Sequence, residues 1–274
     1  MTDNSTPLPE FSEPPVTEVA LSIQFEPVEL SPAQLGIFAL RMKELGYSRI
    51  EQHPPLQPII EQFGPRSDQA RVVFEFGPPA VRHWFISDDR QRLIQVQQDR
   101  FIHNWRKTGS KDRYPRYEGI RETFVERFGE FDHFLAQERL GPVQPNQVEV
   151  TYVNHVRSVR PQPIGSPLAN VVGIAGASFT DGFLPKVEAT RAGAQFVIDH
   201  NAVPVGRLYV NAHTGVDRDT GDPVVVVNMT ARGKPLTPGF EGAMAFMDLG
   251  REWVVRGFAD ATTSDMHALW GRTT

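Results

Sequence analysis

The chain has 274 residues, a formal net charge of −5 and 40% hydrophobic residues, which is typical of one large globular domain or two of moderate size. It contains no cysteine, and this excludes disulfides, thiolate nucleophiles and cysteine-ligated zinc. A small excess of negative charge argues against indiscriminate coating of DNA, although a local basic groove stays open as an alternative.

No targeting or membrane-spanning pattern is found in the sequence. Residues 1–15 are acidic and rich in proline, serine and threonine, so we expect a disordered lead-in and not a signal peptide. The most apolar stretches, 171–177 and 224–227, are far shorter than the ~20 residues of a membrane helix. The sequence therefore predicts a soluble cytoplasmic protein that does not contact a membrane.

The first part of the chain predicts a strand and two helices. Residues 16–25 alternate apolar and polar side chains, as a half-buried strand does. Ser31 and Pro32 supply the N-cap and first position of a helix that we expect to end at Gly46. Residues 117–135 place apolar side chains at helical spacing. Between the helices lie four strand candidates, at 71–76, 81–86, 93–97 and 100–105.

The last two candidates permit two interpretations: one long strand with an irregularity at Gln98-Asp99, or two separate pieces. Read as one strand with a period of two, the stretch 95–105 has no purely apolar face. A buried amide or guanidinium without a partner costs roughly 1 to 3 kcal/mol. Such a strand therefore requires a polar network or an open groove beside it.

The pattern restarts after a linker at 141–146. We expect a strand at 148–156, an apolar crossing segment at 164–179 and a long helix at 239–258. Further strands are expected at 187–190, 195–199, 206–211 and 224–230.

Strands gathered before each long helix predict an α+β protein, in which antiparallel sheets carry the helices on one side. The halves 16–140 and 141–274 share the order strand, crossing segment, strands, helix. This order is similar to the pseudo-repeat of the TATA-binding protein or of a helix-grip fold. We expect the two halves to form one compact unit.

The stretch 95–117 carries more polar and aromatic groups than a packing strand needs. From Asp99 to Glu118 there are six lysine or arginine residues and three acids, a local surplus of positive charge. This composition suits core packing, a protein interface, or base stacking with phosphate contacts. The predicted binding residues are Arg100, His103, Asn104, Trp105, Arg106, Arg113, Tyr114, Arg116 and Tyr117.

Two of these residues carry more specific expectations. Arg100 is expected to be buried and paired with a carboxylate. Trp105 lies at the strand end beside Arg106, so we expect its indole to be half exposed. The candidate carboxylates for Arg100 are Glu18, Glu75 and Glu149.

No nucleophile-elbow, phosphate-loop or dinucleotide motif is present in the sequence. The segment Asp217–Asp222 resembles a calcium loop, but Asn228 stands where such a loop has glutamate, so a hairpin tip is predicted. We expect no metal and no cofactor. The candidates for general acid or base are His103, His155, Asp99 and Glu149.

Three motifs carry a resemblance: QVQQDRFIHNWRK at 95–107, YPRY at 114–117 and EVTYVNH at 149–155. Together with PPV at 14–16 and the ending from Trp253 to Gly271, they resemble a sporadically distributed family of uncharacterised bacterial proteins. The resemblance covers nearly the whole chain and implies no activity.

Since no catalytic motif is present, we expect a non-catalytic intracellular binding protein. It would act through a protein partner or a homodimer, as the regulatory or neutralising member of a two-protein system. The alternative is a nucleic-acid or nucleotide-binding module that uses Arg100–Arg116. A hydrolase using the histidine and carboxylate candidates is the third alternative.

Overall fold

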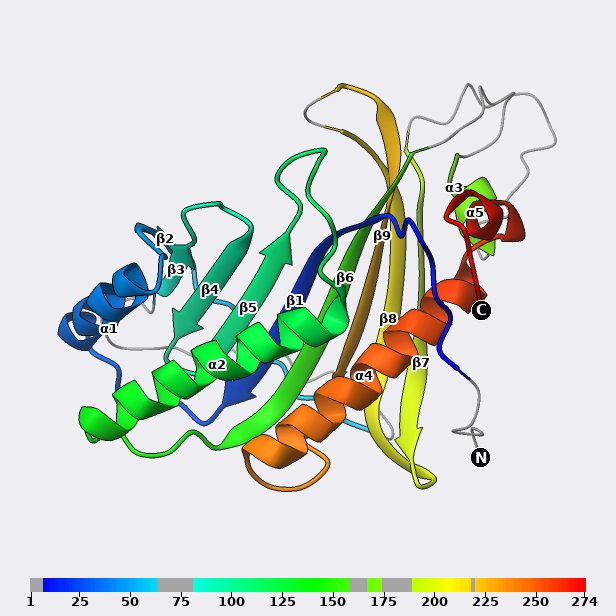
Figure 1. Ribbon diagram of the computed structural model, residues 1–274. Helices are drawn as coiled ribbons and strands as arrows, with labels where there is room; N and C mark the ends of the chain where they lie inside the picture. The colour runs from blue at the N-terminus through cyan, green and yellow to red at the C-terminus, as the bar shows by residue number, and fades with distance from the viewer. Residues whose placement is uncertain (1–6, 64–80, 158–166, 174–188, 218–219) are drawn as a thin grey trace. The chain divides into compact units, whose positions relative to one another are not determined.

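The computed structural model describes residues 7–63, 81–157, 167–173, 189–217 and 220–274 (Figure 1). Nine described strands form an antiparallel sheet in the order β2-β3-β4-β5-β1-β6-β9-β8-β7, and helices complete the α+β class, as predicted. The elements in chain order are β1 (Val16–Phe25), α1 (Pro32–Glu44), β2 (Arg49–His53), β3 (Arg82–Ile86), β4 (Arg92–Gln97), β5 (Arg100–Arg106), α2 (Arg116–Gln137), β6 (Pro145–Arg157), α3 (Pro167–Val171), β7 (Arg191–His200), β8 (Val203–Val216), β9 (Pro223–Gly233), α4 (Phe240–Ala261) and α5 (Ser264–Leu269).

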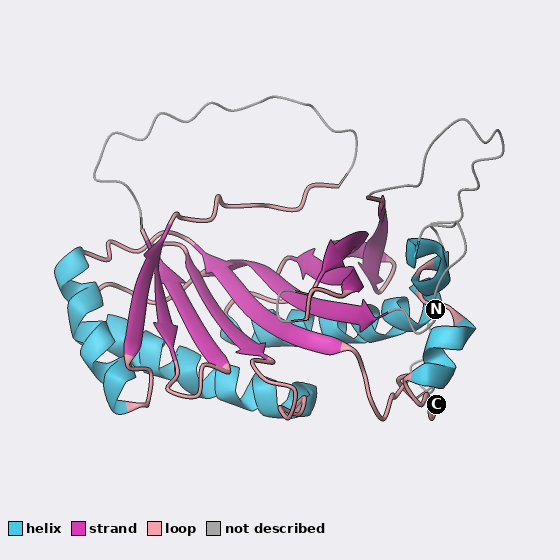
Figure 2. Cartoon of the chain, turned by 90° about the horizontal axis from the view of Figure 1, so that it is seen from above, coloured by secondary structure: helices cyan, strands magenta, loops and turns pink. Residues whose placement is uncertain are grey.

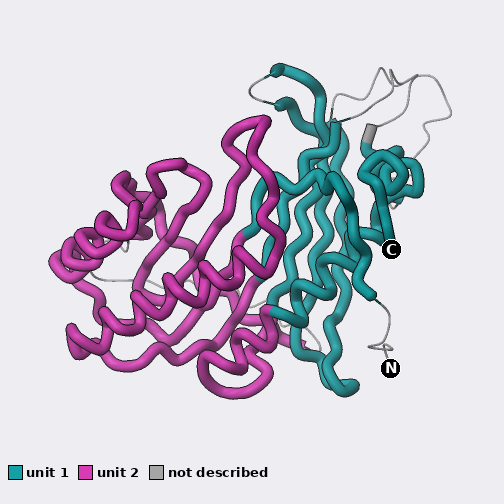
Figure 3. Tube along the Cα trace, in the orientation of Figure 1, with its two compact units in different colours: residues 1–19, 150–232, 248–274 teal, residues 20–149, 233–247 magenta. Residues whose placement is uncertain are grey.

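The chain divides into two compact units (Figure 3). Unit 1 comprises residues 1–19, 150–232 and 248–274, and unit 2 comprises residues 20–149 and 233–247. These limits fall inside β1, β6 and α4, whereas the sequence predicted halves that meet at residues 140 and 141. In each predicted half the first strand neighbours the last one, β1 beside β5 and β6 beside β9. The duplication itself stays a prediction.

Local sequence accounts for the helices of unit 2. Ser31 forms a capping box with Gln34 at the start of α1, and Gly46 adopts a positive φ of 82° just after that helix. α2 buries an apolar stripe because its large side chains recur every three or four residues. Phe131 of α2 contacts both Phe25 of β1 and Phe101 of β5. One face of the unit 2 strands therefore packs against helix.

The other face of the unit 2 strands is called the open face here. It lies opposite α1 and α2, and residues 54–63 run along it as an extended segment without helix or strand (Figure 2). The strand predicted at 71–76, and with it Glu75, lies outside the described residues, as do parts of the segments predicted at 164–179 and 187–190.

In unit 1, β7 and β8 form a hairpin, and the C-terminal part of α4 covers β8 and β9 closely. A Cβ added to Gly257 of α4 would lie 2.6 Å from Leu208 of β8, so glycine permits this approach. β8 and β9 form a second hairpin, as predicted for Asp217–Asp222. The Asp217 N–H donates to the Asp222 carbonyl at 2.8 Å. No described helix is long and apolar enough to cross a membrane.

The expectation of a disordered lead-in over residues 1–15 is wrong for residues 10–13. Phe11 is buried, and its ring centroid lies 5.9 Å from the ring centroids of both Phe258 and Trp270. The Ser12 N–H also donates to the Gly271 carbonyl at 3.1 Å. Tertiary packing against the C-terminal end orders a segment whose composition alone suggested disorder.

Candidate functional site

The β4–β5 hairpin sorts the polar and apolar side chains of the predicted site. Its two-residue turn is Gln98-Asp99, and Gln97 pairs directly with Arg100. Directly opposite residues share a face, so the turn shifts the phase of the alternation. The interpretation as two separate pieces is therefore correct. The open face receives Leu93, Gln95, Gln97, Arg100, Ile102 and Asn104, and the helix face receives Ile94, Val96, Phe101, His103 and Trp105.

Three buried glutamines of the open face, Gln24, Gln97 and Gln147, bind the backbone of the extended segment; they are called the amide row. Gln97 Oε1 accepts the Leu56 N–H at 3.0 Å, and Gln97 Nε2 donates to the Leu56 carbonyl at 2.9 Å. The Ile59 N–H donates to Gln24 Oε1 at 2.9 Å. Each of these bonds replaces a hydrogen bond that a neighbouring strand would otherwise form.

The amide row continues to Gln147, whose Oε1 accepts the Glu61 N–H at 3.2 Å. Arg100 adds two donated bonds, one to Gln24 Oε1 and one of 3.2 Å to the Gln57 carbonyl. Prolines favour an extended backbone and lack an N–H, so this segment cannot pair as a regular strand. Side-chain amides satisfy the backbone groups that a strand ladder would otherwise satisfy. The prolines of the segment are Pro54, Pro55 and Pro58.

The extended segment exposes two adjacent apolar side chains. Ile59 is 43% exposed and Ile60 is 53% exposed, although both belong to a segment held by several hydrogen bonds. Ordered, exposed isoleucines next to each other are typical of a contact surface and not of a solvated loop.

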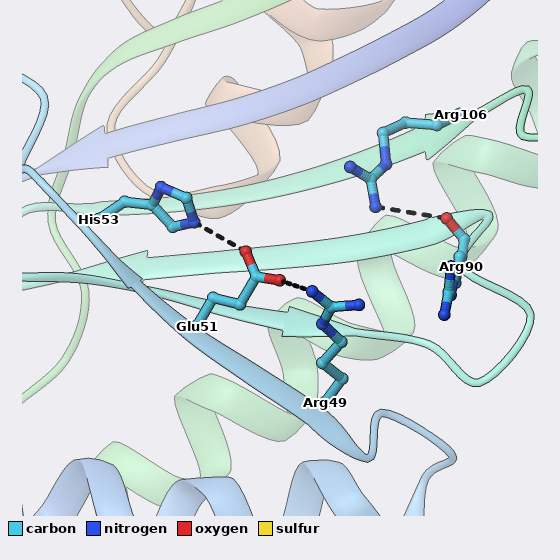
Figure 4. A network of polar contacts seen from close by, with 5 residues as sticks. All are labelled: Arg49, Glu51, His53, Arg90 and Arg106. Carbon is cyan, nitrogen blue, oxygen red and sulfur yellow. Dashed lines mark hydrogen bonds and ion pairs between the residues drawn. The ribbon is translucent and has the colours of Figure 1, made fainter. Parts of the chain in front are cut away.

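An aromatic and charged cluster lies on β2 and β3 at the start of the extended segment. The His53 ring stacks on Trp84 with centroids 3.8 Å apart, and the Arg82 guanidinium lies 5.5 Å from the Trp84 centroid. Glu51 lies between Arg49, at 2.6 Å, and His53, at 3.1 Å (Figure 4). The hydrogen bond from His53 and the charge of Arg49 lower the pKa of the Glu51 carboxyl.

The predicted site residues His103 and Trp105 lie on the helix face and are buried. Burial, together with the positive charges of Arg92 and Arg127, lowers the pKa of His103 to about 3. Neither ring nitrogen of His103 has a hydrogen-bond partner within the described part of the chain. Trp105 is 3% exposed and packs against Tyr114 with centroids 5.5 Å apart, so the expectation of a half-exposed indole is wrong.

Arg100 and Asn104 lie on the open face. Arg100 is buried, as predicted, and it donates to the amide oxygen of Gln24 and to the carbonyl of Gln57. Asn104 Oδ1 accepts a bond of 2.8 Å from Gln95 Nε2. Arg100 therefore belongs to the polar network beneath the extended segment, and Asn104 pairs with Gln95 on the same face.

The other predicted residues lie in or beside the loop between β5 and α2. Arg113 and Arg116 are exposed, and Arg106 is partly exposed with a bond of 3.3 Å to the Arg90 carbonyl (Figure 4). Tyr117, in the first turn of α2, is buried. The predicted set thus separates into an open-face group, a buried group on the helix side and an exposed basic loop.

The acid–base candidates do not assemble along their strands. Asp99 and His103 are four residues apart on β5 and its turn, which corresponds to roughly 13 Å. Glu149 and His155 are six residues apart on β6, roughly 20 Å. Asp99 is buried and accepts a bond of 2.5 Å from Gln97 Nε2. Among the described residues, no group of three or more histidines or acids is placed to hold a metal ion.

Sequence reasoning missed Gln24, Gln147 and the extended segment as parts of the site. Two signals were available. A glutamine stands at a polar position of β1 and of β6, and the proline-rich stretch 54–58 has backbone groups that need hydrogen-bond partners. Comparison of the chain with protein families, with curated proteins and with solved structures found no match.

Proposed function

We propose that this chain is a non-catalytic binding protein that acts by associating with a protein partner at the open face of unit 2. The observation that supports this proposal is the extended segment itself. The amide row and one predicted site residue, Arg100, hold it in place, and it displays Ile59 and Ile60 to solvent. A regulatory or neutralising role in a bacterial two-protein system, in the cytoplasm, is part of the proposal.

The physical features of this surface favour protein association. Its isoleucines lie on the same face as a stacked His53–Trp84 pair and the Arg82 guanidinium, and tryptophan and arginine dominate the binding energy of many interfaces. The amide row already fixes the backbone of the segment, so a partner would not have to offset its ordering entropy. The scattered acid–base candidates give less support to the hydrolase alternative.

Site-specific photo-crosslinking in the native host tests the proposal. A photoreactive amino acid replaces Ile60 in one variant and Leu40 of α1, which is 66% exposed, in the control. The expected result is a crosslink to one recurrent protein from position 60 and none to that protein from position 40. The same protein crosslinked from both positions, no protein at all, or nuclease-sensitive adducts from position 60 would contradict it.

The nucleic-acid alternative has one supporting observation, the exposed basic loop. Lys107, Lys111, Arg113 and Arg116 are all exposed there, whereas Arg100 is held beneath the extended segment. A nucleic acid would therefore meet the loop cations without Arg100. Titration of labelled single-stranded and duplex oligonucleotides separates this alternative from protein association.

A further inference from the structure

Strand β7 forms one edge of the described sheet. Among the residues that the structure describes, it pairs with β8 alone over its ten residues. Phe196 is 48% exposed and Val197 is 44% exposed, one on each face of the strand. Proteins commonly protect edge strands with charges, proline, bulges or short length, because an exposed apolar edge pairs with another chain.

The free backbone groups of β7 belong to its odd-numbered residues. The Thr214 N–H of β8 donates to the Thr190 carbonyl at 3.1 Å, so even-numbered positions turn their backbone groups toward β8. The irregularity near the β7–β8 turn falls on β8, because Ile198 pairs with Gly206 and Asp199 with Pro204. β7 itself therefore stays regular and presents an uninterrupted row of donors and acceptors.

The sequence of β7 is self-complementary about Gln195. When two copies lie antiparallel with Gln195 opposite Gln195, Arg191 of each copy lies opposite Asp199 of the other. Gly193 then lies opposite Val197, and the hydrogen-bonded pairs 191–199, 193–197 and 195–195 are all odd-numbered, as the free backbone groups require. The opposite charges, the side-chain sizes and the free backbone groups of the odd-numbered residues all favour this register.

The same register places Ala194 opposite Phe196 on the other face of the strand, so each exposed ring gains a small neighbour to cover. In the alternative register that is centred on Phe196, the two Phe196 residues lie opposite each other. Arg191 then lies opposite Asn201 and no longer opposite Asp199. Both ion pairs would be lost. The centred register is thus the favourable one.

We propose that two copies of this chain associate through β7, antiparallel and centred on Gln195, as an isologous dimer. Because the contact consists of one strand from each copy, its dissociation constant should lie in the micromolar range. The proposal does not depend on the partner surface of unit 2, since it uses other residues and another unit.

Sedimentation equilibrium of the full chain and of two charge reversals tests the dimer. Arg191→Asp creates two Asp–Asp contacts, and Asp199→Arg creates two Arg–Arg contacts, so each variant alone is expected to be monomeric. An equimolar mixture of the two restores both ion pairs and is expected to form heterodimers. Both residues are exposed, so circular dichroism should show unchanged folding for both variants.

Three results would overturn the proposal. The wild-type chain could be monomeric at every concentration from micromolar to millimolar. The single reversals could dimerise as the wild type does, which would assign dimerisation to another surface. The mixture could remain monomeric while the wild type dimerises, which would exclude this register.

Discussion

The side-chain amide of Gln97 pairs with the backbone of Leu56 in both directions, as a neighbouring strand would. Its Oε1 accepts the Leu56 N–H at 3.0 Å, and its Nε2 donates to the Leu56 carbonyl at 2.9 Å. Nε2 also donates to Asp99 Oδ1. One buried amide thus fixes the extended segment and orients the carboxylate of the β4–β5 turn.

Replacing Gln97 should release the extended segment. Gln97→Leu removes three hydrogen bonds and leaves the part-buried N–H and carbonyl of Leu56 without these partners, so we expect a loss of about 2 kcal/mol in the free energy of unfolding. Gln52→Leu, at an exposed position on β2, should change it by less than about 0.5 kcal/mol. Urea denaturation measures both, and hydrogen exchange at the Leu56 amide should accelerate only in the first variant.

The guanidinium of Arg100 should be structural. Arg100→Ala removes its bonds to Gln24 and Gln57 and leaves buried acceptors, so the free energy of unfolding should fall by about 3 kcal/mol. Arg90→Ala, at an exposed position, is the control. Thermal and urea unfolding measure the difference, and equal stability of the two variants would contradict the role assigned to Arg100.

Trp105 should matter for stability and not for partner contact. Trp105→Ala creates a cavity on the helix face, and such a change costs about 3 to 5 kcal/mol. The half-exposed indole that the sequence predicted would instead give a variant of nearly wild-type stability. Melting curves decide the matter: a variant that melts within a few degrees of the wild type would show that the indole is not core.

His103 should make the protein sensitive to mild acid. Its pKa falls from 6.5 in the unfolded chain to about 3 in the folded one, so between these values the unfolded chain binds more protons. Above pH 6.5 the imidazole is neutral in both states and does not change the free energy of unfolding. Below pH 6.5 the free energy of unfolding falls by ~1.4 kcal/mol for each pH unit. Lowering the pH to about 5 should therefore cost ~2 kcal/mol.

Urea denaturation at both pH values measures this effect in His103→Leu, which removes the titrating group and should show correspondingly less pH dependence. At neutral pH this variant should be at least as stable as the wild type, because the imidazole nitrogens have no described partners. Leu40→Gln, at an exposed position of α1, removes no titrating group and should keep the wild-type pH dependence. A His103→Leu profile parallel to the wild type would refute the assignment.

The exposed basic loop should bind duplex DNA weakly and with strong salt dependence. Four cations can neutralise at most about four phosphates, so the affinity should fall about 100-fold between about 50 and 200 mM salt. Fluorescence anisotropy measures this slope. Changing Lys107 and Lys111 together to glutamine should reduce its magnitude by about 2. Tight, salt-insensitive binding would favour the nucleic-acid alternative over protein association.

Local sequence determined the regular elements. β1, α1, α2 and α4 follow from hydrophobic periodicity and capping, since these signals act between residues a few positions apart. For the stretch at 95–105 the sequence predicted a polar network or an open groove beside it, and its open-face residues Gln97 and Arg100 lie in a polar network. β2 was missed, because its five residues, Arg49–His53, are mostly polar and become a strand only through pairing with β3.

Only the tertiary structure decided which residues of that stretch meet. Whether Gln98-Asp99 is an irregularity or a turn cannot be read from periodicity, yet this choice moves Gln95 and Gln97 to the face of Arg100 and leaves Trp105 in the core. The partners of the amide row are backbone groups of residues 54–63, and local spacing does not show which glutamine meets which of these groups. Side-chain type and spacing are local properties, whereas the burial of a side chain and the pairing of its amide depend on segments that the fold brings together from far along the chain.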